Sequence, residues 1–235
     1  MNTKISLVML GVGILALDPG FASKARATEL LPNLTPKPAE DISVLEDNGH
    51  TYVRFSTITW NSGAGPMELV PDKPESRARK QKVYQKIYSD DRTYRLNFAG
   101  RSVYHPGHAH FHFEGYTKYI LEPLNSPGSS GRSSEKTSSC LLDNLQVNLT
   151  LPGSPANSYY TRCSKDEPQG ISVGWGDLYS YTRSDQSIEI TGLADGDYDL
   201  KIQVDPYNRL IESNDLDNTS SRTIHLANGT VTVVR

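Results

Sequence analysis

Short runs of β-branched and aromatic residues, many alternating with polar positions, recur between turn signals along this chain. The pattern predicts strands over residues 52–60, 67–70, 83–88, 94–98, 187–191, 198–204, 223–226 and 230–234. The dipeptide Asp195-Gly196 predicts a hairpin turn between the two strands that flank it. Beyond residue 27 no stretch keeps the 3.6-residue period of an amphipathic helix. The predicted fold class is therefore all-β: an antiparallel β-sandwich with long loops and little helix.

Three segments between these runs predict loops or edges. Residues 72–82 are highly charged and predict a solvated loop, and residues 125–139 are rich in Ser and Gly and predict a flexible loop. Residues 30–36 contain two prolines, which exclude a central strand and favour an edge segment.

The N-terminus has the pattern of a signal peptide. Lys4 precedes an apolar run over residues 5–17, and Ala25-Arg26-Ala27 offers a small-x-small cleavage site. The run is shorter than the ~20 apolar residues of a membrane-spanning helix, although an uncleaved anchor is the alternative. We expect cleavage after residue 27, one domain over residues 28–235, a secreted or periplasmic location, and no membrane association after cleavage.

The cysteine count agrees with export, and the net charge bears on the kind of partner. Cys140 and Cys163 are the only cysteines, and an even count in an exported chain predicts one disulfide, worth ~3 kcal/mol on the chain-entropy estimate. Two unpaired buried thiols are the alternative. The net charge of −3 provides no basic field, so we expect no nucleic-acid partner.

The candidate chemistry lies in a cluster of histidines. Four of the six histidines fall within eight residues: His105, His108, His110 and His112. In an extended strand the last three share one face, whereas the odd-numbered positions between and after them are apolar and suit a core. A row of imidazoles suits Cu(II) or Zn and does not suit Ca or Mg.

Strand geometry limits this metal site. Residues i and i+4 of a straight strand lie ~13 Å apart, whereas metal–nitrogen bonds are near ~2 Å. The strand must therefore bend, or His105 must contribute as a fourth ligand or a nearby base. Another interpretation is an exposed sheet face that happens to be rich in histidine. A third is a cupin, because His108, His110 and Glu114 fit the first cupin motif, but the second motif is missing.

Five stretches resemble the catalytic domain of the lysyl oxidase family, the copper amine oxidases of extracellular matrix and their bacterial relatives. In the family's order they are residues 31–34, 104–121, 135–143, 174–191 and 211–218. The second is similar to the copper box Trp-His-x-Cys-His-x-His-x-His, with Tyr104 in place of the Trp and Gly107 in place of the Cys.

The resemblance implies a copper site and a quinone cofactor built from the protein's own side chains. Its copper ligands would be His108, His110 and His112. Lys136 and Tyr179 match the lysine and the tyrosine of lysine tyrosylquinone, although by themselves they would be a solvated lysine and a sheet tyrosine. The general base would be His105 or Asp143.

The reaction implied by the resemblance is the oxidation of a primary amine, or of a lysine-containing protein, by O₂. The products are an aldehyde, hydrogen peroxide and ammonia. The sequence does not identify the amine or the oligomeric state. A non-catalytic copper-binding or adhesive β-sandwich protein is the alternative from a different functional class.

The resemblance also implies a calcium site between the opening segment and the acidic C-terminal motif. The matching residues are Asn33, Leu34 (through its carbonyl), Glu212, Asn214, Asp217 and Asn218. All offer oxygen, as a hard cation requires, but Asn33 and Asn214 stand where the family has Asp, which should weaken the affinity. An ordinary Asn/Asp turn is the alternative.

Overall fold

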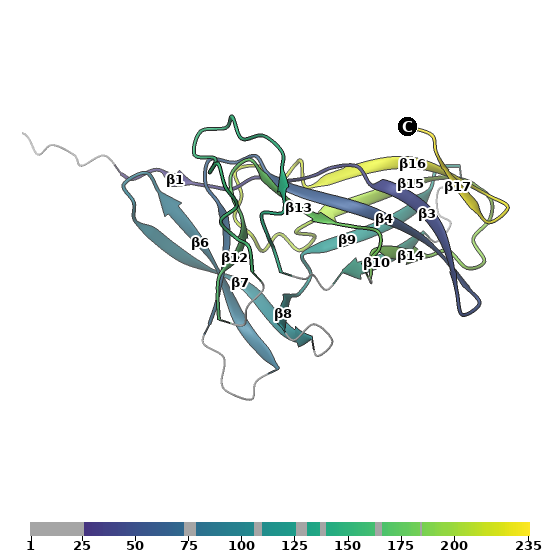
Figure 1. Ribbon diagram of the computed structural model, residues 1–235, viewed down its shortest axis with the longest axis horizontal. Helices are drawn as coiled ribbons and strands as arrows, with labels where there is room; N and C mark the ends of the chain where they lie inside the picture. The colour runs from purple at the N-terminus through teal and green to yellow at the C-terminus, as the bar shows by residue number, and fades with distance from the viewer. Residues whose placement is uncertain are drawn as a thin grey trace, which may run out of the picture.

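The fold consists of antiparallel sheets. The computed structural model describes residues 26–72, 79–105, 110–125, 131–136, 140–162, 166–183 and 185–235. Within those ranges the chain forms seventeen strands in three sheets and no helix (Figure 1). The described residues accordingly contain no helical segment of the length and apolarity needed to cross a membrane. The predicted all-β class is confirmed.

One sheet is built around the long strand β4 (His50–Asn61). Its other members are β2 (Leu34–Pro36), β3 (Glu40–Asp47), β11 (Leu145–Gln146), β13 (Trp175–Tyr179) and β14 (Ser187–Glu189). Strands β3 and β4 form a hairpin whose turn residues, Asn48 and Gly49, have φ values of 51° and 81°. Positive φ at both positions is what a tight two-residue hairpin turn needs, and the Asn-Gly pair provides it at low cost.

A second sheet packs against the first and completes a sandwich. Its strands, in spatial order, are β10 (Arg132–Lys136), β9 (Thr117–Pro123), β15 (Gly196–Val204), β16 (Thr219–Ala227) and β17 (Thr230–Val233). Alternate residues of both sheets fill the space between them. This core includes Val53, Phe55, Tyr119, Leu121, Ile188, Leu200, Ile202 and Ile224. The period-two alternation of the sequence therefore marks the inner faces.

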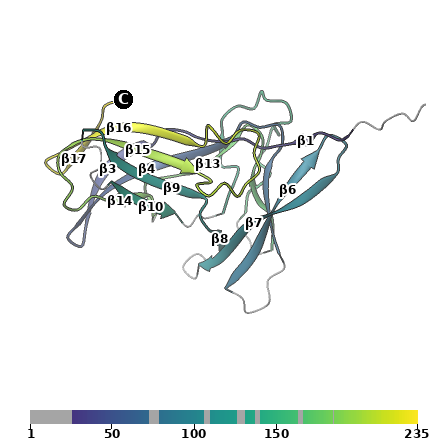
Figure 2. The same ribbon diagram turned by 180° about the vertical axis from the view of Figure 1, so that it is seen from behind.

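A third sheet stands at one end of the sandwich. It contains β12 (Gln169–Ile171), β5 (Met67–Pro71), β6 (Lys80–Ser89), β7 (Tyr94–His105) and β8 (His110–Phe113), and β1 (Glu29–Leu30) pairs with β6. A separate hydrophobic cluster joins it to the sandwich, including Met67, Leu69, Val83, Phe113, Ile171, Trp175 and Val204. Figures 1 and 2 show the hairpin of β6 and β7 projecting away from the sandwich.

Three sequence predictions are wrong in detail. The predicted flexible loop 125–139 contains β10, which pairs with β9, so Lys136 lies at the end of a strand. The predicted loop 72–82 ends earlier, because β6 begins at Lys80. Strands β14 and β15 are not a hairpin: β14 pairs with β4, and β15 lies between β9 and β16. Local pattern indicates that a strand forms but does not select its partner.

A disulfide fixes the segment that follows β10. Cys140 is disulfide-bonded, and its Sγ lies 3.4 Å from the carbonyl oxygen of Arg162. Cys163, the residue after Arg162, is the only other cysteine of the chain and lies outside the described residues.

Candidate functional site

Three of the four clustered histidines, His105, His110 and His112, lie on the antiparallel strands β7 and β8. In the register of β7 and β8, His105 is opposite His110 and Val103 is opposite His112. Directly opposed Cα atoms are about 4.5–5.5 Å apart, and positions i and i+2 of a strand about 7 Å apart. Positions 105, 110 and 112 thus form a compact group on one face of the sheet. Residues 106–109, which include His108, lie outside the described residues.

Both faces of β8 are covered. Phe111 and Phe113 are buried, which confirms the prediction that the odd-numbered positions face a core. His112 is itself only 6% exposed. The interpretation of an exposed histidine-rich sheet face is therefore wrong at His112.

The hairpin suits a copper site in its donor chemistry and in its backbone geometry. A straight row of three histidines would span ~13 Å, whereas the hairpin sets His105 beside His110. The side chains of His105 and His110 are not among those described, and the described side chains alone form no cluster of three or more His, Cys, Asp or Glu groups able to hold a metal. Imidazole ligands suit Zn, Cu, Fe and Ni, so the donor type fits copper without selecting it.

Tyr179 lies at the end of β13, opposite Thr57 of β4. Its side chain is half-buried, and its hydroxyl donates a 2.8 Å hydrogen bond to the carbonyl oxygen of Cys140. The phenol is thus held against the disulfide-bonded segment that follows β10.

Lys136 lies just before the same segment in the chain. It is the last residue of β10 and is paired with Thr117 of β9. Residues 137–139 and the Lys136 side chain are not among those described, but only these three residues separate Lys136 from Cys140. Four Cα–Cα steps span at most about 14 Å. The structure therefore brings Lys136 and Tyr179 to one region of the molecule, although they are far apart in sequence.

Gln169 joins the histidine hairpin to this segment. Its side chain is buried, its Nε2 donates to the carbonyl oxygen of Phe111 at 3.4 Å, and its Oε1 accepts from the backbone N–H of Leu141 at 3.3 Å. Phe111 lies between two of the candidate copper ligands, and Leu141 is next to Cys140. Sequence reasoning missed Gln169, because one glutamine in a Pro/Gly-containing stretch carries no pattern.

Asp143 is buried, and its carboxylate accepts four hydrogen bonds. Its carboxylate accepts from the backbone N–H groups of Tyr159, Tyr160 and Ser172 at 2.8, 3.2 and 2.7 Å, and from the Ser172 hydroxyl at 2.7 Å. These four donors fix the carboxylate against the backbone around Tyr159, Tyr160 and Ser172. The geometry favours a positioning role for Asp143 over the predicted role of general base.

A second buried carboxylate, which sequence reasoning did not single out, lies on the same strand as Tyr179. Asp177 shares a face of β13 with Tyr179, because the two are separated by one residue on the same strand. Its Oδ1 accepts a 3.0 Å hydrogen bond from the side-chain amide of Asn144. A lone aspartate in a short strand gives no signal in the sequence; its burial is visible only in the fold.

The predicted calcium ligands from the two ends of the chain meet as expected from the resemblance. Glu212 is buried and accepts hydrogen bonds from the backbone N–H of Leu34 and from Asn218 Nδ2. The side-chain amide of Asn33 donates to Asp217 Oδ2 at 2.9 Å. The Oδ1 atoms of Asn33, Asp217 and Asn218 are buried and have no hydrogen-bond partner.

These orphaned oxygens fit a hard cation. Burial, with a smaller contribution from nearby carboxylates, raises the pKa of Glu212 to about 8, so this pocket penalises negative charge. A divalent cation would remove the penalty and coordinate the orphaned oxygens. Asn214 differs: it is exposed, and its Oδ1 accepts from the backbone N–H of Leu216, as in the ordinary Asn turn that was the alternative.

Calcium is accordingly expected to raise the melting temperature of the protein. A ligand at one hundred times its Kd stabilises the folded state by about 2.7 kcal/mol, or about 5–10 °C for a chain of this size. Scanning calorimetry with calcium and with chelator measures the shift. Asp217→Asn should abolish most of it, whereas Asp215→Asn, an equal charge change at an exposed neighbour, should retain it. An unchanged melting temperature at millimolar calcium would refute the site.

The fold and the site define an all-β protein with a histidine hairpin at the end of an antiparallel sandwich. The lysyl oxidase family model matches residues 75–235, which cover the hairpin, Lys136, Tyr179 and the acidic C-terminal motif. The chain therefore belongs to the lysyl oxidase family.

Curated relatives agree with this family. The mouse protein lysyl oxidase homolog 4 is 32% identical over 145 residues, and its human counterpart is 31% identical over 145 residues. Each alignment covers 60% of this chain and 18% of the relative. Lysyl oxidase homolog 2 of Xenopus laevis is 33% identical over 113 residues, covering 47% of this chain and 14% of that protein. The chain thus spans less than a fifth of the length of these relatives.

Proposed function

We propose that this protein is a copper-dependent amine oxidase whose quinone cofactor is lysine tyrosylquinone, built from Lys136 and Tyr179. The observation that carries the proposal is the hydrogen bond from the Tyr179 hydroxyl to the carbonyl of Cys140, four residues after Lys136. In a chain of the lysyl oxidase family, this contact sets the two matched residues in one region. It favours an amine oxidase over the cupin alternative.

The reaction proposed is the conversion of a primary amine, O₂ and water to an aldehyde, ammonia and hydrogen peroxide. The substrate is a small primary amine or a lysine-containing protein. The quinone, once formed, supplies an electrophilic carbonyl and accepts two electrons.

Other residues of this chain would bind the metal, orient the phenol and accept the substrate proton. The histidine hairpin would hold copper through His108, His110 and His112, with His105 paired beside them. The Cys140 carbonyl orients the phenol of Tyr179. His105, or a buried carboxylate such as Asp177, would take the proton from the substrate.

The same proposal places the mature protein outside the cytoplasm, secreted or in the periplasm. The disulfide at Cys140 supports this location, because disulfides persist in oxidising compartments. The predicted signal peptide would direct the export, and residues 1–25 of it lie outside the described residues.

The decisive experiment combines mass spectrometry with a peroxide assay on copper-loaded protein. A tryptic digest should contain a peptide pair crosslinked through Lys136 and Tyr179, and n-butylamine should elicit peroxide release. Lys136→Ala should abolish both. Lys118→Ala is the matched control, since Lys118 lies on the neighbouring strand β9, opposite Glu135. Full amine-dependent peroxide release by the Lys136→Ala variant would overturn the proposal, and copper binding without any peroxide release would indicate a non-catalytic binder.

A further inference from the structure

Strand β7 has an unpaired edge over its first half. On one side β7 pairs with β6 along nearly its whole length, and on the other side it pairs with β8 only over Ser102–His105. In the part of the chain that the structure describes, no strand pairs with the second side of residues 94–98. Figures 1 and 2 show this hairpin standing clear of the sandwich.

One face of the unpaired edge is apolar. Tyr94, Leu96 and Phe98 project to one face of β7, and they are 58%, 51% and 53% exposed. Natural proteins protect exposed edges with charges, prolines or short strands, because a long apolar edge is a template for pairing with another chain. An edge that keeps three large apolar side chains in a row indicates a strand partner.

The apolar positions of this edge are arranged symmetrically about its centre. It reads Tyr94-Arg95-Leu96-Asn97-Phe98, with aromatic residues at both ends and leucine in the middle. If two copies pair antiparallel about Leu96, that leucine faces its own copy and Tyr94 faces Phe98. Arg95 then faces Asn97, so no like charges are opposed. A register centred on Arg95 would oppose two arginines.

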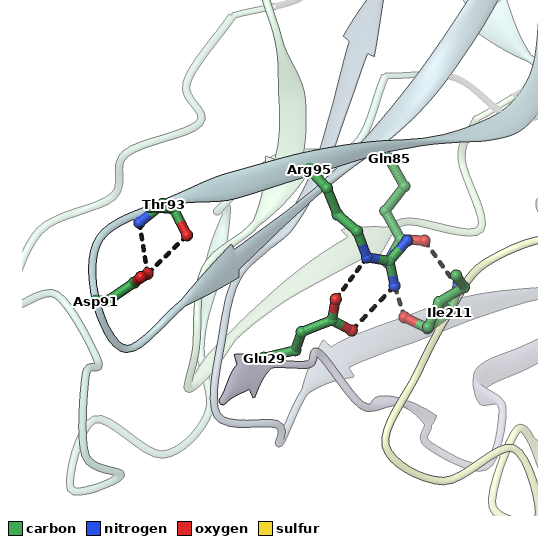
Figure 3. A network of polar contacts seen from close by, with 6 residues as sticks. All are labelled: Glu29, Gln85, Asp91, Thr93, Arg95 and Ile211. Atoms are coloured by element: carbon green, nitrogen blue, oxygen red, sulfur yellow. Dashed lines mark hydrogen bonds and ion pairs between the residues drawn. The ribbon is translucent and has the colours of Figure 1, made fainter. Parts of the chain in front are cut away.

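The edge is already held in the geometry that pairing requires. Figure 3 shows Arg95 bound to both carboxylate oxygens of Glu29, and the Gln85 side-chain amide bound to the backbone of Ile211 through two hydrogen bonds. Asp91 closes the adjoining turn through the backbone and hydroxyl of Thr93. A preformed edge loses little conformational entropy on pairing.

We propose that two copies of this chain dimerise through antiparallel pairing of their β7 edges, centred on Leu96. The free edge is bounded by the irregularity at Ala99, which falls between the pairs made by Phe98 and Gly100, and then by β8. Pairing with one partner therefore occupies the free edge of both copies, so the two-fold assembly stops at a dimer. The proposal is independent of catalysis.

Cysteine crosslinking tests both the edge and the register. Leu96→Cys brings two cysteines face to face across the two-fold axis, at a Cα separation of about 4.5–5.5 Å that a disulfide tolerates. Under mild oxidation this variant should become a covalent dimer. Tyr94→Cys and Phe98→Cys should each remain monomeric on a non-reducing gel and should crosslink when mixed. Val233→Cys, 53% exposed on the edge strand β17, is the matched control.

Sedimentation of the uncrosslinked protein completes the test. The wild type should show a concentration-dependent twofold rise in mass, and Leu96→Lys should remain monomeric over the same range. Because Leu96 is exposed, the lysine variant should fold normally. The proposal fails if the wild type is monomeric throughout, or if Leu96→Cys crosslinks no faster than Val233→Cys. It also fails if Tyr94→Cys alone crosslinks as fast as Leu96→Cys, which would indicate association without this register.

Discussion

Replacing Tyr179 with phenylalanine is expected to abolish amine-dependent peroxide release while leaving the fold and copper binding intact. Phenylalanine cannot be oxidised to a quinone in the way a phenol can, so the proposed cofactor should not form. The fold should survive, because the substitution removes one hydroxyl and its 2.8 Å hydrogen bond to Cys140, worth about 1 kcal/mol. A peroxide assay, circular dichroism and copper analysis of the same preparation measure the three properties, and the absorption spectrum reports whether the quinone is present.

Tyr181→Phe is the matched control for that experiment. Tyr181 is two residues further along the chain, and its ring lies 5.0 Å from the guanidinium carbon of Arg54. Phenylalanine keeps that ring contact and removes a hydroxyl, as at position 179. The Tyr181→Phe variant should keep full activity. Equal loss of activity in the two variants would mean that Tyr179 is not the cofactor tyrosine.

The strands were the part of the fold that the sequence could predict. The alternation over residues 198–204 corresponds to β15, which buries every second side chain, and the apolar run 52–60 corresponds to β4, where residues 55–59 are all buried. The pairing of strands was not predictable in the same way. Arg132–Lys136 carries no apolar alternation, yet it forms an edge strand, since an edge strand needs only one partner and tolerates polar side chains.

The candidate site shows the same division between local and long-range information. The histidine spacing correctly placed an apolar row on one face of β8, because alternation is a local property of a strand. The pairing of His105 with His110 depends on the register between β7 and β8, which the spacing of the histidines does not encode. Gln169 and Asp177 have no local pattern at all; their relation to the site arises from contacts between strands that are distant in sequence.

Asp143→Asn is expected to destabilise the protein by about 3 kcal/mol, because the native carboxylate serves four donors at once. An asparagine keeps the size of the side chain but replaces one acceptor oxygen with a donating amide. That amide must face backbone N–H groups, which leaves buried donors unsatisfied. Urea unfolding measures the change, and Ser172→Ala should cost less, since it removes the Ser172 hydroxyl donor and preserves the charge.

The same substitution separates a positioning role of Asp143 from a catalytic one. If Asp143 positions the segment between Cys140 and Ser172, the asparagine variant should turn over amine at nearly the native rate when assayed well below its lowered melting temperature. If Asp143 is the general base, turnover should fall by ~10²-fold or more at every temperature, whatever the loss of stability. The four hydrogen bonds favour the first outcome, because they tie the segment after Cys140 to the backbone of Tyr159, Tyr160 and Ser172.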